Sequence, residues 1–317
     1  MTSKAAEDSV FNADSAPSSD SEATPETSNV KTSRKRLNDM NGKDWVKSTK
    51  SVWMDSNDRE FMRTVEDAMK SGSMFSESPP RDQWKKKHPA TFSENDVGKL
   101  IRFFTQSGET VLDPFLGSGS SAIASINEGR HFFGIELYSE WFDIAKQRIN
   151  QLDNQQNVSC DIRMGDSLEV MRGLEAESFD FIVTSPPYWG ILGKKDHKAK
   201  NERIDKGLAT DYGNHPLDLS HVESYSQFLE TLSEHFSEYY RILNRSKYAA
   251  IIVSDFRHGK EYYMFHSDIA SLMRRNGLVI QGLIVLIQDN KKLYPYGYPS
   301  TYVPNISNQF IVIGRKL

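Results

Sequence analysis

The stretch "VLDPFLGSGSSA" at 111–122 holds the first residues whose types and spacing indicate chemistry. Gly117 and Gly119 follow an apolar run and precede a helical pattern, so the backbone there can approach a ligand without a Cβ in the way. With Ala122 they satisfy the Gly-x-Gly-x-x-Ala spacing of a dinucleotide-binding turn, and Glu136, about twenty residues later, is placed to bind ribose hydroxyls. The stretch therefore predicts a site for a nucleotide-containing cofactor, and a turn used only for packing is the alternative.

Two acidic positions distinguish the kind of cofactor. Asp113, followed by Pro114, puts a carboxylate where a pyrophosphate would be repelled and an ammonium group attracted. This sign of charge favours S-adenosylmethionine over a nicotinamide dinucleotide. Asp166, in "MGDSLEVM", could accept a hydrogen bond from an adenine amine, although an acidic residue here is also typical of the start of a helix.

A second stretch, "TSPPYW" at 184–189, offers hydrogen-bond acceptors for an amine. Pro186 and Pro187 fix φ and remove two N–H groups, which leaves carbonyl oxygens held in set directions. The exocyclic amine of a nucleobase is a poor nucleophile that presents two N–H donors. Ser185 and a proline carbonyl can accept both hydrogen bonds, which frees the nitrogen lone pair to attack a sulfonium methyl group. Tyr188 would stack on the base after it is flipped out of the duplex; a rigid turn that only ends a strand is the alternative.

These residues need a scaffold that brings the ends of separate strands together. From about residue 92 strand patterns alternate with helical patterns, which predicts an α/β fold with a doubly wound, mostly parallel sheet of seven strands. The expected strands are "TVLDPF", "HFFGIEL", "VSCDIR", "FDFIVT", "YAAIIVSDF", "LVIQGLIVLIQ" and "QFIVIG". The expected helices lie at 92–104, 118–127, 139–152, 225–243 and 261–275, with Ser93 and Asp96 as a capping pair for the first. We expect "TSPPYW" to follow a strand adjacent to the first one, and the last two strands, with no helix between them, to pair antiparallel.

The N-terminal third has a different composition. The first 30 residues contain six acidic residues and Lys4 but almost no large apolar side chain, which predicts a disordered acidic and polar tail over 1–36. An accessory helical segment is expected over 37–87, and the α/β domain over 88–317. The spacing of the apolar residues in the accessory segment suits a short amphipathic helix through Trp45, Val46, Val52 and Trp53.

Charge and cysteine content limit the class of protein. The first 30 residues carry a charge of −5 and the whole chain a net charge of −4, so residues 31–317 are close to neutral, and only local clusters could neutralise phosphates. These clusters lie at 31–36, 85–87, 194–200 and 291–292. A single cysteine, Cys160, excludes an intramolecular disulfide and a multi-cysteine zinc site. Since no leader-like or membrane-spanning apolar stretch is present, we expect a soluble cytoplasmic protein with no metal.

Five short motifs in a compatible order carry a resemblance to a known family. The motifs "HPATF" (88–92), "DPFLGSG" (113–119), "GIEL" (134–137), "GDS" (165–167) and "TSPPYW" resemble those of the DNA amino-methyltransferases, which methylate cytosine N4 or adenine N6 with S-adenosylmethionine. The resemblance covers about 88–317 and implies a Rossmann-like class I methyltransferase fold, DNA as the partner, and a role in restriction-modification beside a cognate restriction enzyme that the sequence does not identify. It implies cofactor binding by His88, Thr91, Phe92, Asp113, Phe115, Gly117, Gly119, Glu136 and Asp166. It implies catalysis by Ser185, Pro186, Pro187 and Tyr188.

The residue that heads the turn bears on the target base. A serine at position 185 resembles the cytosine N4 branch, since aspartate is commoner in the adenine N6 branch. We therefore predict a site-specific cytosine-N4 DNA methyltransferase, with adenine N6 methylation and RNA methylation as alternatives. Cys160 lies inside a strand, which argues against methylation of cytosine at carbon 5. A nicotinamide-dependent oxidoreductase using Gly117, Gly119 and Glu136, or a catalytically inactive nucleic-acid-binding protein, is the alternative from another class.

Recognition of the target sequence has no obvious separate domain. It is expected to come from the N-terminal segment, the 190–221 loop and "NKKLYPYGYPSTYVPN" at 290–305. The candidate DNA-binding residues are Trp189, Lys291, Lys292, Tyr296 and Tyr298, which combine cations for phosphates with rings for base stacking. Packing of these tyrosines on the sheet is the alternative.

Overall fold

The computed structural model describes residues 38, 39, 41, 52–53, 93–152, 156–190, 213–287, 306 and 308–317, and of 52–53 only the backbone. All of them lie in one compact unit, Arg36–Leu317. The expected tail, most of the accessory segment and the four basic clusters lie outside these residues. Within the described ranges, no helix is long and apolar enough to cross a membrane.

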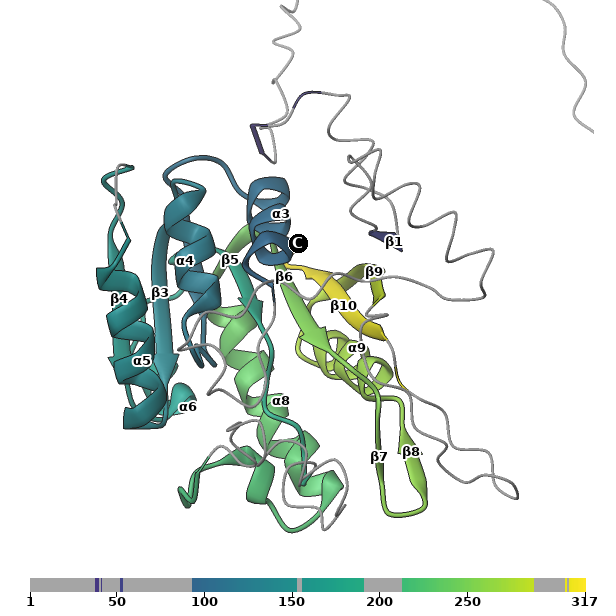
Figure 1. Cartoon of the computed structure of the whole chain (residues 1–317). Coiled ribbons are helices and arrows are strands. Elements are labelled where there is room, and N and C mark those ends of the chain that lie inside the picture. The colour runs from purple at the N-terminus through teal and green to yellow at the C-terminus, as the bar shows by residue number, and fades with distance from the viewer. Residues whose placement is uncertain are drawn as a thin grey trace, which may run out of the picture. The chain divides into compact units, whose positions relative to one another are not determined.

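The central element is a sheet with the strand order β1-β9-β10-β6-β5-β2-β3-β4 (Figure 1). Its strands are β1 (Val52–Trp53), β2 (Thr110–Asp113), β3 (His131–Glu136), β4 (Cys160–Met164), β5 (Phe179–Thr184), β6 (Leu243–Val253), β9 (Val279–Ile287) and β10 (Asn308–Arg315). The strands from β2 to β6 run parallel to one another, whereas β10 runs antiparallel to both β6 and β9. The predicted α/β fold with a mostly parallel sheet is confirmed, as are the adjacency of β2 and β5 and the antiparallel pairing of the last two strands.

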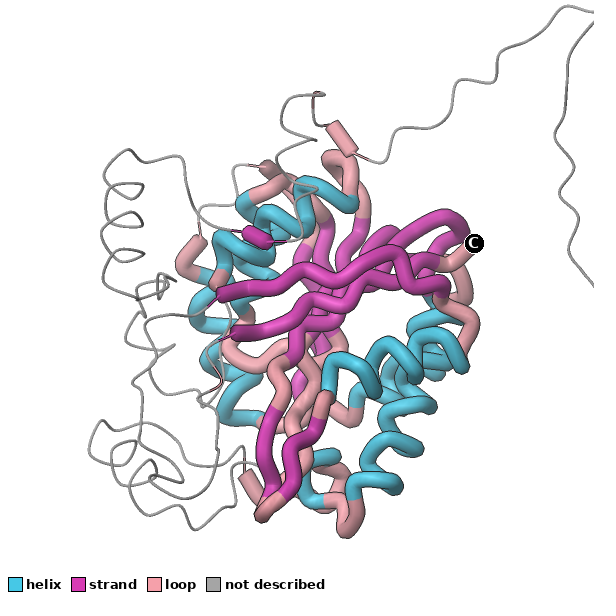
Figure 2. The backbone as a smooth tube through the Cα atoms, turned by 90° about the vertical axis from the view of Figure 1, so that its right-hand side faces the viewer, coloured by secondary structure: helices cyan, strands magenta, loops and turns pink. Residues whose placement is uncertain are grey.

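Helices cover both faces of this sheet (Figure 2). They are α3 (Glu94–Phe104), α4 (Ser120–Asn127), α5 (Ser139–Asn150), α6 (Ser167–Arg172), α8 (Tyr225–Ile242) and α9 (Phe265–Arg275), with a short 3-10 turn η1 (Leu219–His221). The predicted capping of α3 is confirmed, because the Ser93 hydroxyl accepts a hydrogen bond from the Asp96 N–H. This cap satisfies one of the backbone donors that the first turn of a helix leaves without a partner.

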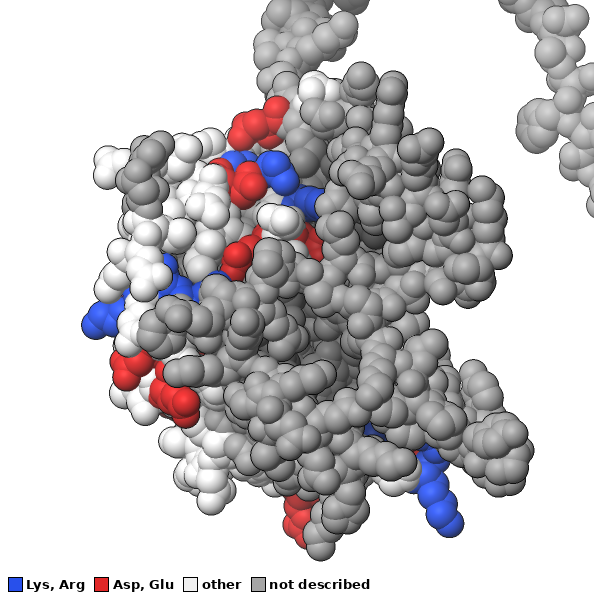
Figure 3. Space-filling view, viewed as in Figure 1, with Lys and Arg blue, Asp and Glu red and all other residues white. Residues whose placement is uncertain are grey.

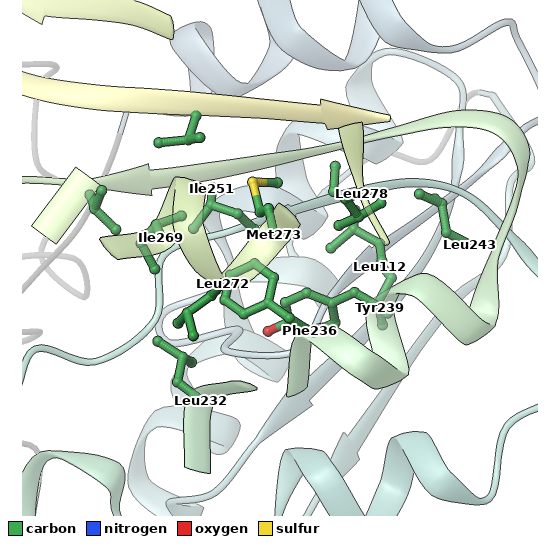
Figure 4. Close-up of a cluster of buried hydrophobic side chains, with 14 of the residues drawn as sticks. Leu112, Leu232, Phe236, Tyr239, Leu243, Ile251, Ile269, Leu272, Met273 and Leu278 are labelled. Atoms are coloured by element: carbon green, nitrogen blue, oxygen red, sulfur yellow. The ribbon is translucent and has the colours of Figure 1, made fainter. Parts of the chain in front are cut away.

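Successive residues of the central strands point into two separate cores. Leu112 and Ile251 belong to the core covered by α6, α8 and α9, whereas Val111 and Ala250 belong to the core covered by α3, α4 and α5. Figure 4 shows the first of these cores, where Phe236 and Tyr239 of α8 meet Leu272 and Met273 of α9. Because both faces are buried, the strands read in the sequence as continuous apolar runs.

Three elements differ from the sequence-based expectation. Val52 and Trp53 form strand β1 on β9, not part of a helix, so the sheet gains an eighth strand at this edge. The helix expected over 261–275 begins at Phe265, because the residues before it form a hairpin of β7 (Phe256–His258) and β8 (Glu261–Tyr263). Helix α6 was not predicted, since its six residues are too short to show a helical period.

Candidate active site at the carboxyl edge of the sheet

Most of the predicted site residues that the structure describes lie at one edge of the sheet. Because β2, β3 and β5 are parallel neighbours, Asp113, Glu136 and Ser185 all lie at or just after the carboxyl end of a strand. Figure 1 labels β3 and β5, which flank β2 in the sheet. This edge is where ligands bind in open α/β sheets.

The glycine loop joins β2 to α4. Gly117 and Gly119 have φ values of 55° and 81°, in the left-handed region that glycine adopts without strain. Gly119 is the N-cap of α4, and a Cβ added to it would lie 3.1 Å from the Ala145 Cβ. The loop therefore needs glycine at 119 both for its backbone conformation and for the close approach of α5.

Glu136 is tied to this loop. One carboxylate oxygen accepts the Gly117 N–H at 2.7 Å and the other accepts the Tyr138 N–H at 3.0 Å. Burial raises the pKa of Glu136 to about 7, and the nearby Asp113 carboxylate adds to this rise. The structure thus places the Glu136 carboxylate beside the glycine loop, while its contact with ribose hydroxyls stays a prediction.

Asp113 has no exposed surface, and protein groups surround its carboxylate. One oxygen accepts the Phe115 N–H at 3.0 Å and the Thr184 hydroxyl at 2.5 Å, and the other accepts the Ser121 hydroxyl at 2.5 Å. Burial raises the pKa of Asp113 to about 6, although these three hydrogen bonds oppose the rise. Asp113 thus fastens the glycine loop to α4 and to β5, a role that the sequence did not reveal, while its contact with a cofactor ammonium group stays a prediction.

The Pro-Pro turn leaves the end of β5 beside this loop. Pro186 is buried, whereas Ser185, Pro187 and Tyr188 are half-buried. The Tyr188 hydroxyl oxygen accepts the Ser254 N–H at 2.8 Å, at the end of the next strand, β6. Burial raises the pKa of Tyr188 to about 12, against hydrogen bonds from Ser254 and from the Gln309 and Ser185 side chains. The phenol is therefore neutral at physiological pH, and its oxygen is anchored while the ring is only partly covered.

Trp189, a predicted DNA-binding residue, has its indole N–H bonded to the Val222 carbonyl at 2.8 Å. Its ring packs against His258 at a centroid distance of 4.4 Å and against Tyr225 at 5.5 Å. These contacts fix Trp189 between the turn, the hairpin and the start of α8. Its contact with DNA stays a prediction.

Asp166 follows β4 and is the N-cap of α6. This agrees with the alternative interpretation of Asp166 as an acidic residue at the start of a helix. Its carboxylate caps the helix by accepting the Glu169 N–H at 2.9 Å. The next residue, Ser167, lies 2.9 Å from Nε2 of the buried His235, whose ring stacks on Phe115 at a centroid distance of 5.4 Å. His235 thus joins two predicted cofactor positions, Phe115 and the start of α6. Sequence reasoning missed it because it lies beside the apolar stripe of α8.

A second contact that sequence reasoning missed lies just after β3, where Tyr138 binds the segment around 215–218. The Tyr138 hydroxyl donates to the Asp218 carboxylate at 2.6 Å and accepts the His215 N–H at 3.3 Å. Tyr138 also binds Glu136 through its N–H, so the segment around 215–218 is fastened directly to the strand end that carries Glu136. No pattern in the sequence indicates a pairing of residues 80 positions apart.

Several predicted residues cannot be placed. His88, Thr91, Phe92, Lys291, Lys292, Tyr296 and Tyr298 lie outside the described residues. In the part of the chain that is described, no cluster of three or more histidine, cysteine, aspartate or glutamate side chains could hold a metal ion. Of the predicted site, the structure describes the glycine loop, the acidic residues, the Pro-Pro turn and Trp189.

Cys160 is half-buried in the edge strand β4, and burial raises the pKa of its thiol to about 11. The thiol is therefore protonated at neutral pH, where a nucleophile needs the thiolate. Its position in β4 also separates it from the end of β5.

Comparisons with known proteins agree with the geometry. A family model described as DNA methylase, of the N6/N4 type, matches residues 9–147, a stretch that contains the glycine loop and Glu136 but ends before the Pro-Pro turn. The Type II methyltransferase M2.LlaDCHI of Lactococcus lactis subsp. cremoris is 30% identical over 115 residues, which are 33% of this chain and 43% of the relative. The Type II methyltransferase M2.DpnII of Streptococcus pneumoniae is 28% identical over 121 residues, 35% of this chain and 45% of the relative. The chain thus spans less than half the length of either relative.

Among solved structures, a SAM-dependent methyltransferase from Methanosarcina mazei aligns with a TM-score of 0.44 at 15% identity. The alignment covers 69% of this chain and 97% of that one.

Proposed function

We propose that this chain, which belongs to the family of DNA N4/N6 amino-methyltransferases, transfers a methyl group from S-adenosylmethionine to an exocyclic amine of a base in DNA. The observation that carries the proposal is the hydrogen bond from the Thr184 hydroxyl to Asp113. It joins the loop expected to bind the cofactor to the turn expected to bind the amine.

The residues at the strand ends suit S-adenosylmethionine. Glu136 offers a buried carboxylate at the end of β3, and Gly119 leaves the start of α4 without a Cβ. The Ser120 hydroxyl, on the first turn of α4, is buried and has no hydrogen-bond partner among the described residues. A polar ligand atom in this loop would satisfy it, since buried polar groups are normally paired. We therefore infer that the glycine loop, Glu136 and Asp166 hold the cofactor.

When bound, S-adenosylmethionine supplies an electrophilic methyl group. The chain itself must bind the flipped base and make its amine nucleophilic. We infer that the Ser185 hydroxyl and the Pro186 carbonyl accept hydrogen bonds from the two N–H groups of the amine. These bonds draw the nitrogen towards tetrahedral geometry. In the transfer the nitrogen gains the methyl group and releases one proton, while the methyl–sulfur bond breaks. Tyr188, whose oxygen is anchored to Ser254, presents its ring to the base.

Cytosine N4 is the acceptor that we propose, because Ser185 heads the turn. Adenine N6 is the nearest alternative. Incubation of the chain with labelled S-adenosylmethionine and mixed-sequence DNA, followed by mass spectrometry of the nucleosides, is expected to give N4-methylcytosine. Label at N6 of adenine would assign the chain to the adenine N6 methyltransferases. Label at carbon 5 of cytosine, or no label, would contradict the proposed chemistry.

The setting of the reaction is part of the same proposal. The curated relatives are Type II methyltransferases. On this resemblance we propose that the chain works in the cytoplasm, beside a cognate restriction enzyme.

The raised pKa of Glu136 gives a prediction for cofactor binding. Its pKa of about 7 means that the carboxylate, the better acceptor for ribose hydroxyls, becomes the main form only as the pH rises through that value. If only the ionised form binds, affinity for methylthioadenosine should rise by about tenfold between pH 6 and pH 8. Methylthioadenosine carries the ribose but not the titrating amino acid part of the cofactor, and calorimetry measures its binding.

Glu136→Gln provides the control for this measurement. It keeps an acceptor oxygen but cannot ionise, so its affinity should not depend on pH over the same range. Asp113, whose pKa is about 6, is retained in this variant. Any pH dependence of methylthioadenosine affinity that remains in Glu136→Gln would therefore be assigned to Asp113. An affinity of the unaltered chain that is the same at pH 6 and pH 8 would contradict the assignment of Glu136.

A further inference from the structure

The hairpin β7–β8 leaves the same edge of the sheet as the Pro-Pro turn. It starts three residues after the end of β6, pairs Phe256 with Tyr263 and His258 with Glu261, and turns at Gly259, whose φ is 62°. Figures 1 and 2 show it extending away from the main sheet. Three residues at a rise of about 3.3 Å each carry its tip roughly 10 Å beyond its base.

The base of the hairpin is fastened to the proposed catalytic turn. The Tyr188 hydroxyl accepts the N–H of Ser254, two residues before β7, and the Tyr188 ring meets Phe256 edge-on at 6.1 Å. Trp189 packs against His258 at 4.4 Å and Tyr263 at 5.9 Å. Two successive aromatic residues of the turn therefore hold the two hairpin strands, so the position of the hairpin is coupled to that of the turn.

The hairpin carries two cations and one anion, a net charge of +1. Residues 256–263 contain two basic residues, Arg257 and Lys260, and one acidic residue, Glu261. The Glu261 carboxylate accepts a hydrogen bond from the Tyr263 hydroxyl at 2.7 Å. Arg257 donates to the Lys260 carbonyl at 2.8 Å, so its guanidinium lies at the turn, beside the backbone of Lys260. No carboxylate of the described residues forms an ion pair with the exposed Lys260 ammonium. In Figure 3, viewed as Figure 1, Lys and Arg side chains project from this region.

We propose that β7–β8 is a DNA-binding element that contacts the phosphates beside the target nucleotide through Arg257 and Lys260. This inference rests on the proposed function, because a base that is flipped into the turn must be held by contacts to the flanking backbone. A two-stranded ribbon is an element that the major groove admits. Its length of roughly 10 Å spans about three base-pair steps of 3.4 Å, which matches contacts to phosphates next to the flipped base.

Lys260→Gln in the full chain tests the proposal. The variant removes one charge from the exposed tip and leaves the Arg257 contact, which uses the backbone carbonyl, in place. With a duplex oligonucleotide and S-adenosylhomocysteine, the slope of the logarithm of DNA affinity against the logarithm of salt concentration should fall by about one. At 0.1 M salt this corresponds to roughly eightfold weaker binding. The double variant Arg257→Gln, Lys260→Gln should lower the slope by about two.

Lys146→Gln is the matched control, because Lys146 is an exposed lysine on α5 and its loss makes the same change in net charge. Its salt slope should equal that of the unaltered chain. If Lys260→Gln also keeps the unaltered slope while the unaltered chain binds and methylates the duplex, the hairpin proposal is overturned and the proposed function stands. If the unaltered chain binds no duplex and methylates none, both are overturned.

Discussion

Replacement of Ser185 by alanine should lower the rate of methyl transfer by about 100-fold while DNA and cofactor still bind. The hydroxyl is expected to accept a hydrogen bond from the amine in the transition state, where the nitrogen becomes tetrahedral. Its loss therefore reduces the rate of methyl transfer more than the affinity for DNA. Alanine leaves the two prolines and the Ser254–Tyr188 hydrogen bond in place, although it removes the Ser185 hydrogen bond to the Tyr188 oxygen. Single-turnover methylation with saturating DNA measures the rate, and fluorescence anisotropy measures DNA binding.

Ser178→Ala is the control for this experiment. Ser178 directly precedes the opposite end of the same strand, is half-buried, and its hydroxyl donates to the Glu175 carbonyl. Its loss should leave the methylation rate within a factor of about two, since the substitution lies away from the sites that produce large effects. A Ser185→Ala chain as active as the Ser178→Ala chain would show that the turn does not act through its serine hydroxyl.

Replacement of Thr184 by valine should lower the free energy of unfolding by about 2 kcal/mol at pH 8. Valine fills nearly the same space but cannot donate to Asp113, whose carboxylate then loses one of its three hydrogen bonds in a site with no exposed surface. Urea denaturation measures the loss. Thr231→Val, at a half-exposed position where the hydroxyl bonds only the Gln227 carbonyl, should cost less than about 0.5 kcal/mol.

The pH dependence of this loss identifies its cause. The pKa of Asp113 is already raised to about 6 by burial, and loss of the Thr184 donor raises it further. An acid whose pKa is raised by folding keeps its proton in the folded state, so stability falls as the pH rises from the unfolded pKa to the folded one. In the Thr184→Val variant, the free energy of unfolding goes on falling to a higher pH than in the unaltered chain, because its Asp113 has the higher pKa. The difference between the two should be small at pH 5 and full at pH 8, and a difference that is equal at both values would contradict the role of Asp113.

The sequence predicted those parts of the fold that depend on neighbouring residues. Apolar runs of four to eleven residues located the strands of the main sheet from β2 onward, and the two glycines located the turn that starts α4. Both signals are local, since period and glycine content are set within a few residues. The alternation of strands and helices then fixed the parallel order, because crossover connections leave few arrangements.

Contacts between distant residues could not be predicted in this way. Thr184 and Asp113 are 71 residues apart, and Tyr138 and Asp218 are 80 residues apart. The hairpin was missed because the helical pattern of α9 continues backwards through "EYYM", so that Tyr262 and Tyr263 read as part of its first turn. In the structure Tyr263 instead stacks on Phe256 at 5.2 Å. Aromatic packing across the hairpin therefore outweighed local helix propensity.

The adjacency of β2 and β5 also orders events during synthesis of the chain. When β2, β3 and β4 have left the ribosome, β2 has a partner on one side only, because β5 lies later in the sequence. Until Thr184 is made, Asp113 lacks one of its three donors, and its carboxylate stays open to water on that side. The glycine loop proposed to hold the cofactor is thus completed by the strand that carries the proposed catalytic turn. A nascent or truncated chain that ends before β5 lacks both, so under the proposed function it would gain the means to hold a methyl donor only together with the means to direct it.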